Sequence, residues 1–302
     1  MNCRVCKQRA AVEIRRHNAA FCPDHFVEHV QRQVARTIHD YEMFGPDDRL
    51  LLGVSGGKDS LALWDILTGL GYAVDGVYLH LGIGEYSSES LILTEQFAAE
   101  RDLALRVVDL PVDYGFSIPQ AAATQGRSAC SVCGLSKRYL LNDAAAGYDA
   151  LVMGHNLDDE AATLLGNVLK WNTEYLGRQA PVLPAVEGLA RKVKPLIRVA
   201  ERETAAYAVL RGIEYEVEEC PMVAGNTINR LKERMSVLEA NSPGVKQQFL
   251  FGFFERGAGH FEVGEKTELG SCRSCGSPTT GDVCAFCRVR DRATHPLEVR
   301  ES

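Results

Sequence analysis

The sequence lacks any long apolar stretch. Although 46% of its 302 residues are hydrophobic, no segment approaches the roughly 18 consecutive apolar residues that a membrane-spanning helix needs. The first ten residues also lack the apolar run of a secretory signal peptide, and they carry Arg4, Lys7 and Arg9 instead. These absences argue against a membrane or secreted protein and predict a cytoplasmic location.

Positive charge is scarce as well. The chain has 33 Lys and Arg against 40 Asp and Glu, a formal net charge of -7, whereas nonspecific nucleic-acid binders normally present a basic surface. Any contact with RNA must therefore be local. Two basic runs are candidates for it, although such runs are often only solvated faces. The runs are Arg191, Lys192, Lys194, Arg198 and Arg202, and then Arg230, Lys232 and Arg234.

Internal repeats and long low-complexity tracts are absent too. Short apolar runs instead alternate with helical patterns between residues 48 and 265. The runs are RLLLGVS, AVDGVYLHL, LRVVDL and ALVMG, and the first two precede helices expected from about Asp59 and Ser87. This alternation predicts an α/β fold built on a doubly wound parallel sheet. Domain boundaries are expected at 44–48, where Gly45 and Pro46 break a helix, and at 265–271.

A glycine-rich loop follows the first predicted strand. The strand at 50–54 runs into Ser55, Gly56, Gly57, Lys58, Asp59 and Ser60, and then into an apolar helix. Backbone amides of such a loop close around an anion at the helix N-terminus, and Lys58 adds a positive charge. The spacing is not that of a Walker motif. SGGKDS resembles the PP-loop of the ATP pyrophosphatase superfamily, whose members cleave ATP to AMP and pyrophosphate while adenylating a carbonyl oxygen. The alternative is an ordinary turn capped by Asp59.

Other strand ends should contribute to the same site, since ligands of such sheets lie beyond the carboxyl ends of the strands. The second strand, around Tyr78, is expected beside the adenine, mainly through its backbone. The fourth ends in GHNLDDE, residues 154–160, where carboxylates opening a helix can hold Mg²⁺ with the phosphates. Helix capping by Asp158 and Asp159 is the alternative, and we favour a functional role for Asp159.

The ten cysteines fall into three groups, and in a cytosolic chain they are expected to stay reduced. The two outer groups each offer four ligands in two pairs, CxxC followed by CxxH in the first group and CxxC followed by CxxC in the second. This is the pattern of structural zinc sites. The groups are Cys3, Cys6, Cys22 and His25, and then Cys272, Cys275, Cys284 and Cys287. Such sites stabilise small folds and are expected to shape a surface for RNA or for a second subunit. His17, His29 and His39 have no matching partners and are expected at the surface.

The middle group is incomplete as a zinc site, which normally takes four protein ligands. Cys130 and Cys133 form an isolated CxxC, and Cys220 stands far along the chain. An iron–sulfur cluster held by three cysteines leaves one iron open, which suits the binding of hydrosulfide. A redox-active CxxC with a spare Cys220 is the alternative. Lys137 places a charge near the phosphates or the sulfur, or is a surface helix lysine.

Taken together, SGGKDS, the middle CxxC, GHNLDDEA, Cys220 and the two outer clusters resemble the TtuA family, relatives of the eukaryotic Ncs6 wobble-uridine thiolases, over essentially the whole chain. The resemblance implies ATP-dependent 2-thiolation of a tRNA uridine. It also implies a 4Fe-4S cluster on Cys130, Cys133 and Cys220, a ubiquitin-like protein thiocarboxylate as sulfur donor, and a homodimer. We expect uridine 54 of the T-loop as the target, with wobble uridine 34 as the alternative.

The resemblance also assigns residues to the reaction. Those implied for ATP are Gly53, Ser55, Gly56, Gly57, Lys58, Asp59, Ser60, Tyr78, Gly154 and Asp159. Lys137 and Asp159 are the implied catalytic polar residues beside the three cysteines. The uridine C2 oxygen attacks the α-phosphorus, pyrophosphate leaves, and sulfur from the open iron displaces AMP. A zinc-ribbon RNA-binding scaffold and a PP-loop amidating enzyme are the rival functions.

The predicted organisation has three parts. Residues 1–30 form an N-terminal zinc finger, followed by a helical linker to about 47. Residues 48–265 form the PP-loop catalytic domain, and residues 266–302 form a C-terminal zinc ribbon. The expected ligands are thus a 4Fe-4S cluster, two Zn²⁺, ATP and Mg²⁺.

Overall fold

The computed structural model describes residues 1–126, 128–186, 188–223, 227–261 and 269–295. Its centre is a six-stranded sheet in the order β5-β4-β3-β6-β8-β7. Neighbouring strands pair in parallel, except that the edge strand β7 is antiparallel to β8. The strands are β3 (Leu50–Val54), β4 (Val74–His80), β5 (Leu105–Asp109), β6 (Ala150–Val152), β7 (Val182–Leu183) and β8 (Lys192–Val193). The predicted doubly wound α/β fold is confirmed, with one antiparallel edge added.

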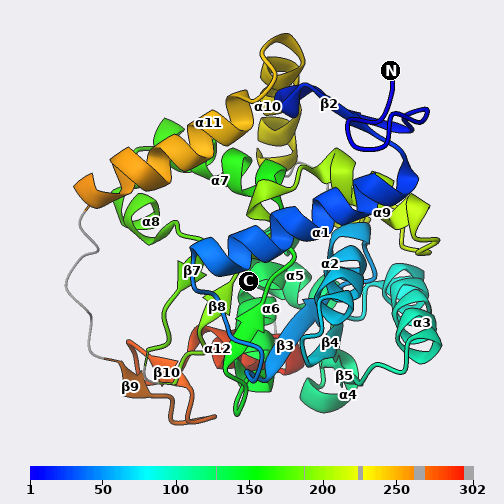
Figure 1. Cartoon of the computed structure of the whole chain (residues 1–302). Helices are drawn as coiled ribbons and strands as arrows, with labels where there is room; N and C mark the ends of the chain where they lie inside the picture. Colours follow the sequence, from blue (N-terminus) through cyan, green and yellow to red (C-terminus); the bar gives the residue numbers. More distant parts are fainter. Residues whose placement is uncertain (127, 187, 224–226, 262–268, 296–302) are drawn as a thin grey trace.

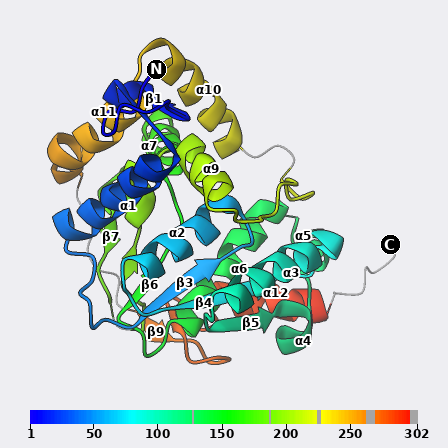
Figure 2. The ribbon, with the colours of Figure 1, turned by 45° about the vertical axis from the view of Figure 1, so that its right-hand side comes forward.

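Helices cover both faces of this sheet because successive strand residues point to opposite sides. Leu50 and Leu52 pack among helices on one side, whereas Leu51 packs on the other. The first side carries α1 (Pro23–Asp40), α2 (Lys58–Gly69), α3 (Gly84–Glu100) and α9 (Glu201–Leu210). The second carries α4 (Leu110–Tyr114), α5 (Ile118–Gln125), α6 (Ala129–Ala144) and α12 (Ala285–Thr294). Figures 1 and 2 show α1 and α12 separated by the sheet.

A further group of helices stands beyond the carboxyl end of β6. Helix α7 begins directly after that strand, and α10 and α11 pack against it around Leu164 and Leu250. These helices are α7 (Leu157–Leu169), α8 (Thr173–Arg178), α10 (Thr227–Asn241) and α11 (Val245–Gly252). Short helical turns complete the chain: η1 (Arg15–His17), η2 (Pro195–Arg198), η3 (Phe253–Gly257) and η4 (Ala258–His260). In the ranges that the structure describes, no helix combines the length and apolar character needed to cross a bilayer.

Each end of the chain carries a small antiparallel hairpin. At the N-terminal end, β1 (Val12–Ile14) pairs with β2 (Ala19–Phe21) just before α1. At the other, β9 (Gly270–Ser271) pairs with β10 (Pro278–Thr279), and α12 follows. The ring of Phe286 on α12 stacks on Tyr139 of α6 with centroids 3.9 Å apart, which packs α12 against α6. The predicted three-part division stays a prediction, and its boundary at 265/266 lies outside the described residues.

Two local expectations need adjustment. Helix α1 ends at Asp40, ahead of the expected break at Gly45 and Pro46. The expectation that three histidines lie at the surface is wrong for His17 and His29. Both are half-buried with ring centroids 5.6 Å apart, and His29 stacks on Phe21. The side chain of His39 is 90% exposed, as expected.

Candidate functional site

The loop between β3 and α2 leaves backbone donors free. Helix α2 begins at Lys58, and its N-cap, Gly57, has no side chain to satisfy the first N–H groups of the helix. Gly56 has φ +75°, and a Cβ atom there would lie 2.7 Å from the carbonyl oxygen of Ser90, so only glycine fits. The Ser60 hydroxyl accepts the Ser55 N–H at 3.1 Å and lies 3.0 Å from the Gly57 carbonyl oxygen. The loop is therefore a preformed anion cradle.

This loop forms one wall of a cavity of about 340 Å³, a volume typical of small-molecule sites. The ends of β4 and β6 and one face of α6 form the rest. The cavity is lined by most of the predicted site residues, namely Gly53, Ser55, Gly57, Asp59, Ser60, Tyr78, Cys133, Lys137, Gly154, Asp159 and Cys220. Gly56, Lys58 and Cys130 are not among its lining residues.

The strand ends present backbone to the cavity. The Tyr78 hydroxyl donates to the carbonyl oxygen of Ser87 at 2.7 Å, and burial raises the pKa of Tyr78 to about 12, so its phenol stays neutral and structural. At Gly154 a Cβ atom would lie 3.3 Å from the Cα atom of Ser60, because the end of β6 passes close to the glycine-rich loop. Tyr78 and Gly154 both line the cavity, and their backbone contribution to nucleotide binding stays a prediction.

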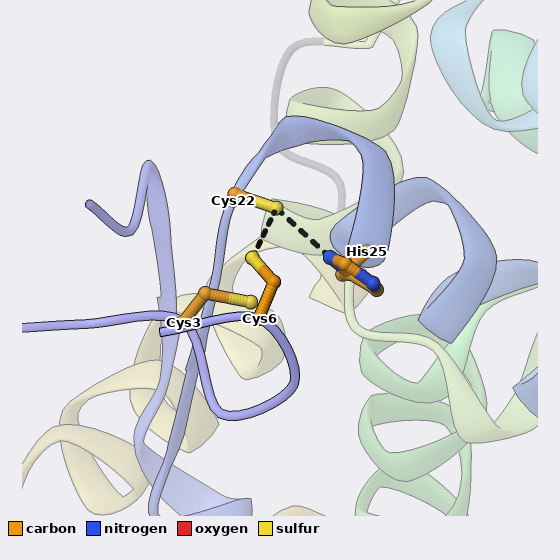
Figure 3. A group of neighbouring side chains, drawn as sticks. All are labelled: Cys3, Cys6, Cys22 and His25. Atoms are coloured by element: carbon orange, nitrogen blue, oxygen red, sulfur yellow. Dashed lines mark hydrogen bonds between the residues drawn. The ribbon is translucent and has the colours of Figure 1, made fainter. Parts of the chain in front are cut away.

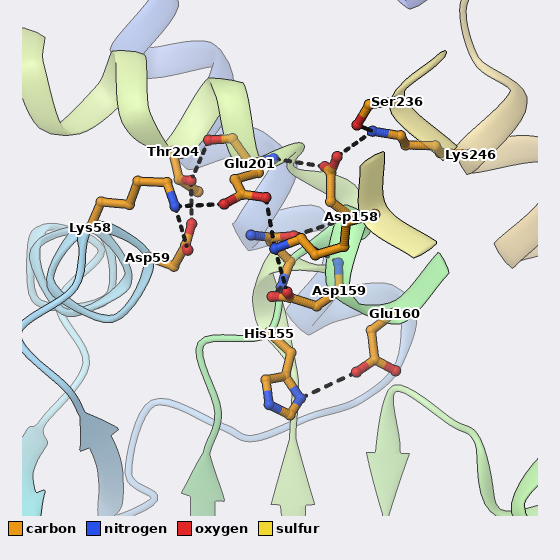
Figure 4. Close-up of polar contacts among 12 residues, drawn as sticks. Lys58, Asp59, His155, Asp158, Asp159, Glu160, Glu201, Thr204, Ser236 and Lys246 are labelled. Atoms are coloured by element: carbon orange, nitrogen blue, oxygen red, sulfur yellow. Dashed lines mark hydrogen bonds and ion pairs between the residues drawn. The ribbon is translucent and has the colours of Figure 1, made fainter. Parts of the chain in front are cut away.

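The Lys58 ammonium contacts two carboxylates (Figure 4), and Lys58 is not a lining residue of the cavity. Its Nζ lies 2.9 Å from Glu201 Oε1 and 3.1 Å from Asp59 Oδ2. The other Glu201 oxygen lies 2.7 Å from Lys232 Nζ. Burial would raise the pKa of Glu201, but hydrogen bonds from Lys232 and Lys58 outweigh it and lower the pKa to about 2. Sequence reasoning missed Glu201, since it lies 143 residues from Lys58 with no motif around it.

Asp159 both caps a helix and faces the cavity. Its Oδ2 accepts the Asn156 N–H at 3.1 Å in a capping box at the start of α7, and its Oδ1 lies 2.9 Å from Lys232 Nζ. The structural and functional readings of this residue are therefore compatible. Lys232, considered above within a basic run for RNA, lies between Asp159 and Glu201 instead. Nothing in the local sequence distinguishes it from its solvated neighbours.

Asp158 has a different environment from its neighbour (Figure 4). Its Oδ1 forms an ion pair with Lys246 of α11, and its Oδ2 accepts the Glu201 N–H at 2.8 Å. The side chains of Asp158 and Lys246 are only 8% and 6% exposed. Lys246 also lies 3.0 Å from the Ser236 hydroxyl of α10. Asp158 thus connects α7 with α9 and α11 through buried polar contacts.

Glu160 anchors the next turn of the same helix. Its carboxylate lies 2.8 Å from Lys194 Nζ and 3.2 Å from His155 Nδ1. Burial opposes ionisation of Glu160, but Lys194 and His155 outweigh it and lower its pKa to about 2. Lys194, from the first basic run, is therefore engaged in an internal ion pair. His155 lines the cavity with half of its side chain exposed.

The three middle cysteines lie close to one another at the cavity. Cys133 and Cys220 line it, and Cys130 Sγ lies 3.6 Å from the carbonyl oxygen of Met222, beside Cys220. Burial raises the pKa of Cys133, and the neighbouring thiols Cys220 and Cys130 raise it further, whereas Lys137 opposes the shift. Cys133, Cys220 and Lys137 thus line the same cavity as the glycine-rich loop, whereas Cys130 is not among its lining residues.

The outer cysteine sets are more compact than the middle trio, and Figure 3 shows the N-terminal set of Cys3, Cys6, Cys22 and His25. Within each predicted set of four, the ligand atoms lie within 4.8 Å of one another. The Sγ atoms of Cys6 and Cys22 are 3.7 Å apart, as are those of Cys275 and Cys284. That spacing matches the roughly 3.8 Å edge of a tetrahedron with metal–sulfur bonds of about 2.3 Å. The middle trio is not among the sets this compact in the described part of the chain, which suits a polynuclear cluster better than one ion.

The second outer set is also prepared to hold thiolate. Backbone N–H groups of Cys284 and Ser274 donate to Cys272 Sγ at 3.2 and 3.4 Å, and they lower the pKa of Cys272 to about 6. Burial raises the pKa of Cys284 and Cys287, and nearby cysteines add to the effect at both. Four sulfur atoms this close are suited to binding one cation, which would hold them as thiolates.

Comparisons with known proteins agree with this geometry. Two family models match the chain: the 2-thiouridine synthetase TtuA N-terminal LIM domain over residues 2–27, and the PP-loop domain over residues 26–238. The chain is 50% identical to a tRNA-5-methyluridine(54) 2-sulfurtransferase of Thermus thermophilus, covering 96% of this chain and 91% of the relative. It is 40% identical to the Pyrococcus horikoshii protein of the same name, with 95% and 93% covered.

A solved structure shares the fold. The U34-tRNA thiolase NcsA from Methanococcus maripaludis, with its 4Fe-4S cluster, matches with a TM-score of 0.80 at 24% identity. The match covers 96% of this chain and 95% of the thiolase. The fold described above thus belongs to an architecture known from a solved structure.

Proposed function

Because this chain belongs to the TtuA family of PP-loop tRNA 2-sulfurtransferases, we propose that it replaces the C2 oxygen of the uridine at position 54 of tRNA with sulfur. Position 54 stands in the names of the Thermus and Pyrococcus relatives. One observation carries the proposal: the anion cradle and the cysteines Cys133 and Cys220 line the same cavity. Activation by ATP and delivery of sulfur can therefore act on one uridine.

The first half of the reaction uses the glycine-rich loop. The free N–H groups at the start of α2 bind the phosphates of ATP, and the backbone at Tyr78 and Gly154 borders the adenosine. Asp159 holds Mg²⁺ together with the phosphate oxygens. Lys58 reaches the phosphates by exchanging its Glu201 contact for them. The uridine C2 oxygen then attacks the α-phosphorus, and pyrophosphate leaves.

The second half takes place at the cysteine end of the cavity. A 4Fe-4S cluster on Cys130, Cys133 and Cys220 would supply an iron without a cysteine ligand, at which sulfur is held for transfer. Lys137, exposed beside Cys133, stabilises the negative charge of the incoming sulfur and of the departing phosphate. Sulfur attacks C2, and AMP leaves with the former C2 oxygen.

The proposal has three further parts, which concern zinc, the sulfur donor and the assembly. The two outer sets each hold one Zn²⁺ in the hairpin modules at residues 1–30 and 266–302, on either side of a catalytic domain at 48–265. The sulfur donor is a ubiquitin-like protein with a C-terminal thiocarboxylate. The protein acts as a homodimer in the cytoplasm.

Fragment-mapped mass spectrometry of tRNA nucleosides tests the function. Protein with a reconstituted cluster is incubated with unmodified tRNA, ATP, Mg²⁺ and sulfide. Wild type should form 2-thiouridine at position 54, and Cys220→Ser should form none and lose iron while keeping its circular dichroism spectrum. Ser131→Ala, between the two cysteines of the CxxC, is the matched control and should stay active.

The outcomes separate the parts of the proposal. Absence of thiolation by the wild type contradicts the function, and thiolation at position 34 contradicts the assigned target. Full activity of iron-free Cys220→Ser contradicts the role of the cluster.

A further inference from the structure

A second cavity, of about 500 Å³, lies between the N-terminal hairpin, α1 and η2. Four arginines line it: Arg4, Arg32, Arg36 and Arg198. No acidic side chain is among the described residues that line it. This concentration of positive charge occurs in a chain with a net charge of -7. A concave surface of one sign focuses the electrostatic field on a ligand of the opposite sign.

The nearby carboxylates do not neutralise this cavity. Asp40 lies 3.2 Å from Arg36 Nε and 2.9 Å from Arg198, so one carboxylate serves two guanidinium groups. The contact of Arg32 with Glu28, at 3.3 Å, joins side chains that are more than half exposed, and such pairs are weak. The Arg4 guanidinium makes no ion pair or hydrogen bond within the ranges the structure describes. A net positive charge therefore remains for a ligand.

The cavity also holds polar atoms without partners. The Nε2 atoms of His17 and His29 are buried, and no described residue hydrogen-bonds to them. The same is true of Arg198 Nε. Buried polar atoms are almost always satisfied, and leaving one unsatisfied is costly. Burial lowers the pKa of both histidines to about 4, and nearby positive groups add to the shift: arginines at both rings, and His17 at His29. Each ring is therefore neutral and has one N–H donor, and the Nε2 atoms lie beneath the surface of the cavity wall.

We propose that this cavity binds a backbone phosphate of the tRNA substrate, an inference that rests on the proposed function. A phosphodiester supplies both the negative charge and the acceptor oxygens that guanidinium groups bind best. A neighbouring cavity of about 540 Å³ shares His17 and Gln247 with it and is lined by both Arg256 and Glu255. The four arginines without an acidic lining residue thus distinguish the first cavity as the phosphate site.

The cavity is also connected to the catalytic residues. Arg198 lies three residues before Glu201, whose carboxylate holds Lys58 and Lys232. The guanidinium of Arg198 lies 4.7 Å from the ring centroid of Phe251, which fixes its direction. Phosphate contacts set the register of a nucleic acid on a protein. Binding here therefore helps to position the tRNA relative to the ATP cavity.

The test compares Arg4→Gln and Arg32→Gln with Arg9→Gln, a control in the same N-terminal module whose exposed side chain does not line the cavity. Binding of unmodified tRNA is measured by fluorescence anisotropy between 50 and 200 mM salt. Each cavity variant should bind about 5- to 10-fold more weakly at the lower salt. The slope of log K against log salt should become shallower by about 0.7 to 0.9 for each lost phosphate contact. Arg9→Gln should match the wild type, and ATP affinity should not change.

Two outcomes would overturn the inference, and separate measurements check the fold of the variants. Wild-type binding and slope in both cavity variants would overturn the inference. So would stabilisation by inorganic phosphate that is lost in Arg4→Gln while tRNA binding is unchanged, since the cavity would then serve a small anion. Zinc content and thermal melting check the fold, and Arg32→Gln, on the outer face of α1, decides the case if Arg4→Gln misfolds. A wild type that binds tRNA without thiolating it contradicts the proposed function, while the salt slopes still decide the cavity.

Discussion

Replacing Asp158 by Asn is expected to destabilise the protein, whereas the same change at Asp159 is expected to impair catalysis. The two carboxylates are adjacent in sequence and open the same helix. Asp158 is buried against Lys246, whereas Asp159 lines the cavity and contacts Lys232. One conservative substitution therefore separates a structural role from a catalytic one.

The magnitudes follow from burial. Asp158→Asn leaves the Lys246 ammonium, 6% exposed, without a counter-charge, and breaking a buried pair in this way costs about 3 to 5 kcal/mol. At about 2 °C per kcal/mol for a chain of this size, the melting temperature should fall by about 6 to 10 °C. Asp159 is 29% exposed, and its partner Lys232 keeps Glu201 at 2.7 Å. Its replacement should cost about 1 kcal/mol or less but lower the thiolation rate on the order of 100-fold.

Thermal melting and single-turnover thiolation of tRNA measure the two effects. A double variant, Asp158→Asn with Lys246→Met, should recover much of the lost stability, because it removes the uncompensated charge. Wild-type stability of Asp158→Asn would refute the reasoning about the buried pair. A fully active Asp159→Asn protein would refute its assigned role at the phosphates.

Two further predictions concern pH and metal. The pKa of Glu160 is lowered to about 2 in the folded chain, so its stabilising effect is present above its unfolded pKa of about 4.3 and is lost as pH falls toward 2. Wild type should therefore lose about 2 to 3 kcal/mol more than Glu160→Gln between pH 7 and pH 2 in urea titrations, and equal losses would contradict this. Cys272→Ser should lose one of two bound zinc ions and melt several degrees lower, since the second hairpin loses its closing ligand set. Elemental analysis and melting check it, and a fully stable variant with one zinc would show that the site is dispensable.

Local patterns predicted much of the fold and of the site. The alternation of short apolar runs with helices predicted the sheet, and SGGKDS predicted a loop that the structure shows as an anion cradle. The sequence also predicted the two outer cysteine sets, because each pair of ligands spans only a few residues and metal geometry constrains that spacing. In each case the interacting groups are close in sequence, so their spacing carries the information.

Ion pairs between residues far apart in the chain could not be predicted from the sequence in this way. Lys58 and Glu201 are 143 residues apart, and Asp158 and Lys246 are 88 apart. No periodicity links such positions, and a lysine such as Lys232 has the same local context whether it is solvated or placed between two carboxylates. The distinction between Asp158 and Asp159 was equally hidden, since both are good residues for the first turn of a helix.

The sequence by itself thus determined the α/β architecture, the glycine-rich loop and the grouping of the outer cysteines into two compact sets, because these depend on short-range spacing and backbone conformation. Only the tertiary structure decided which charges are buried together and which remain free. It gathered Arg4, Arg198 and two histidines from separate segments into one cavity, and it turned Lys58 toward Glu201. The physical reason is that electrostatic environment depends on distance in space and on burial, and the packing of α1, α9, α10 and α11 around the sheet sets both.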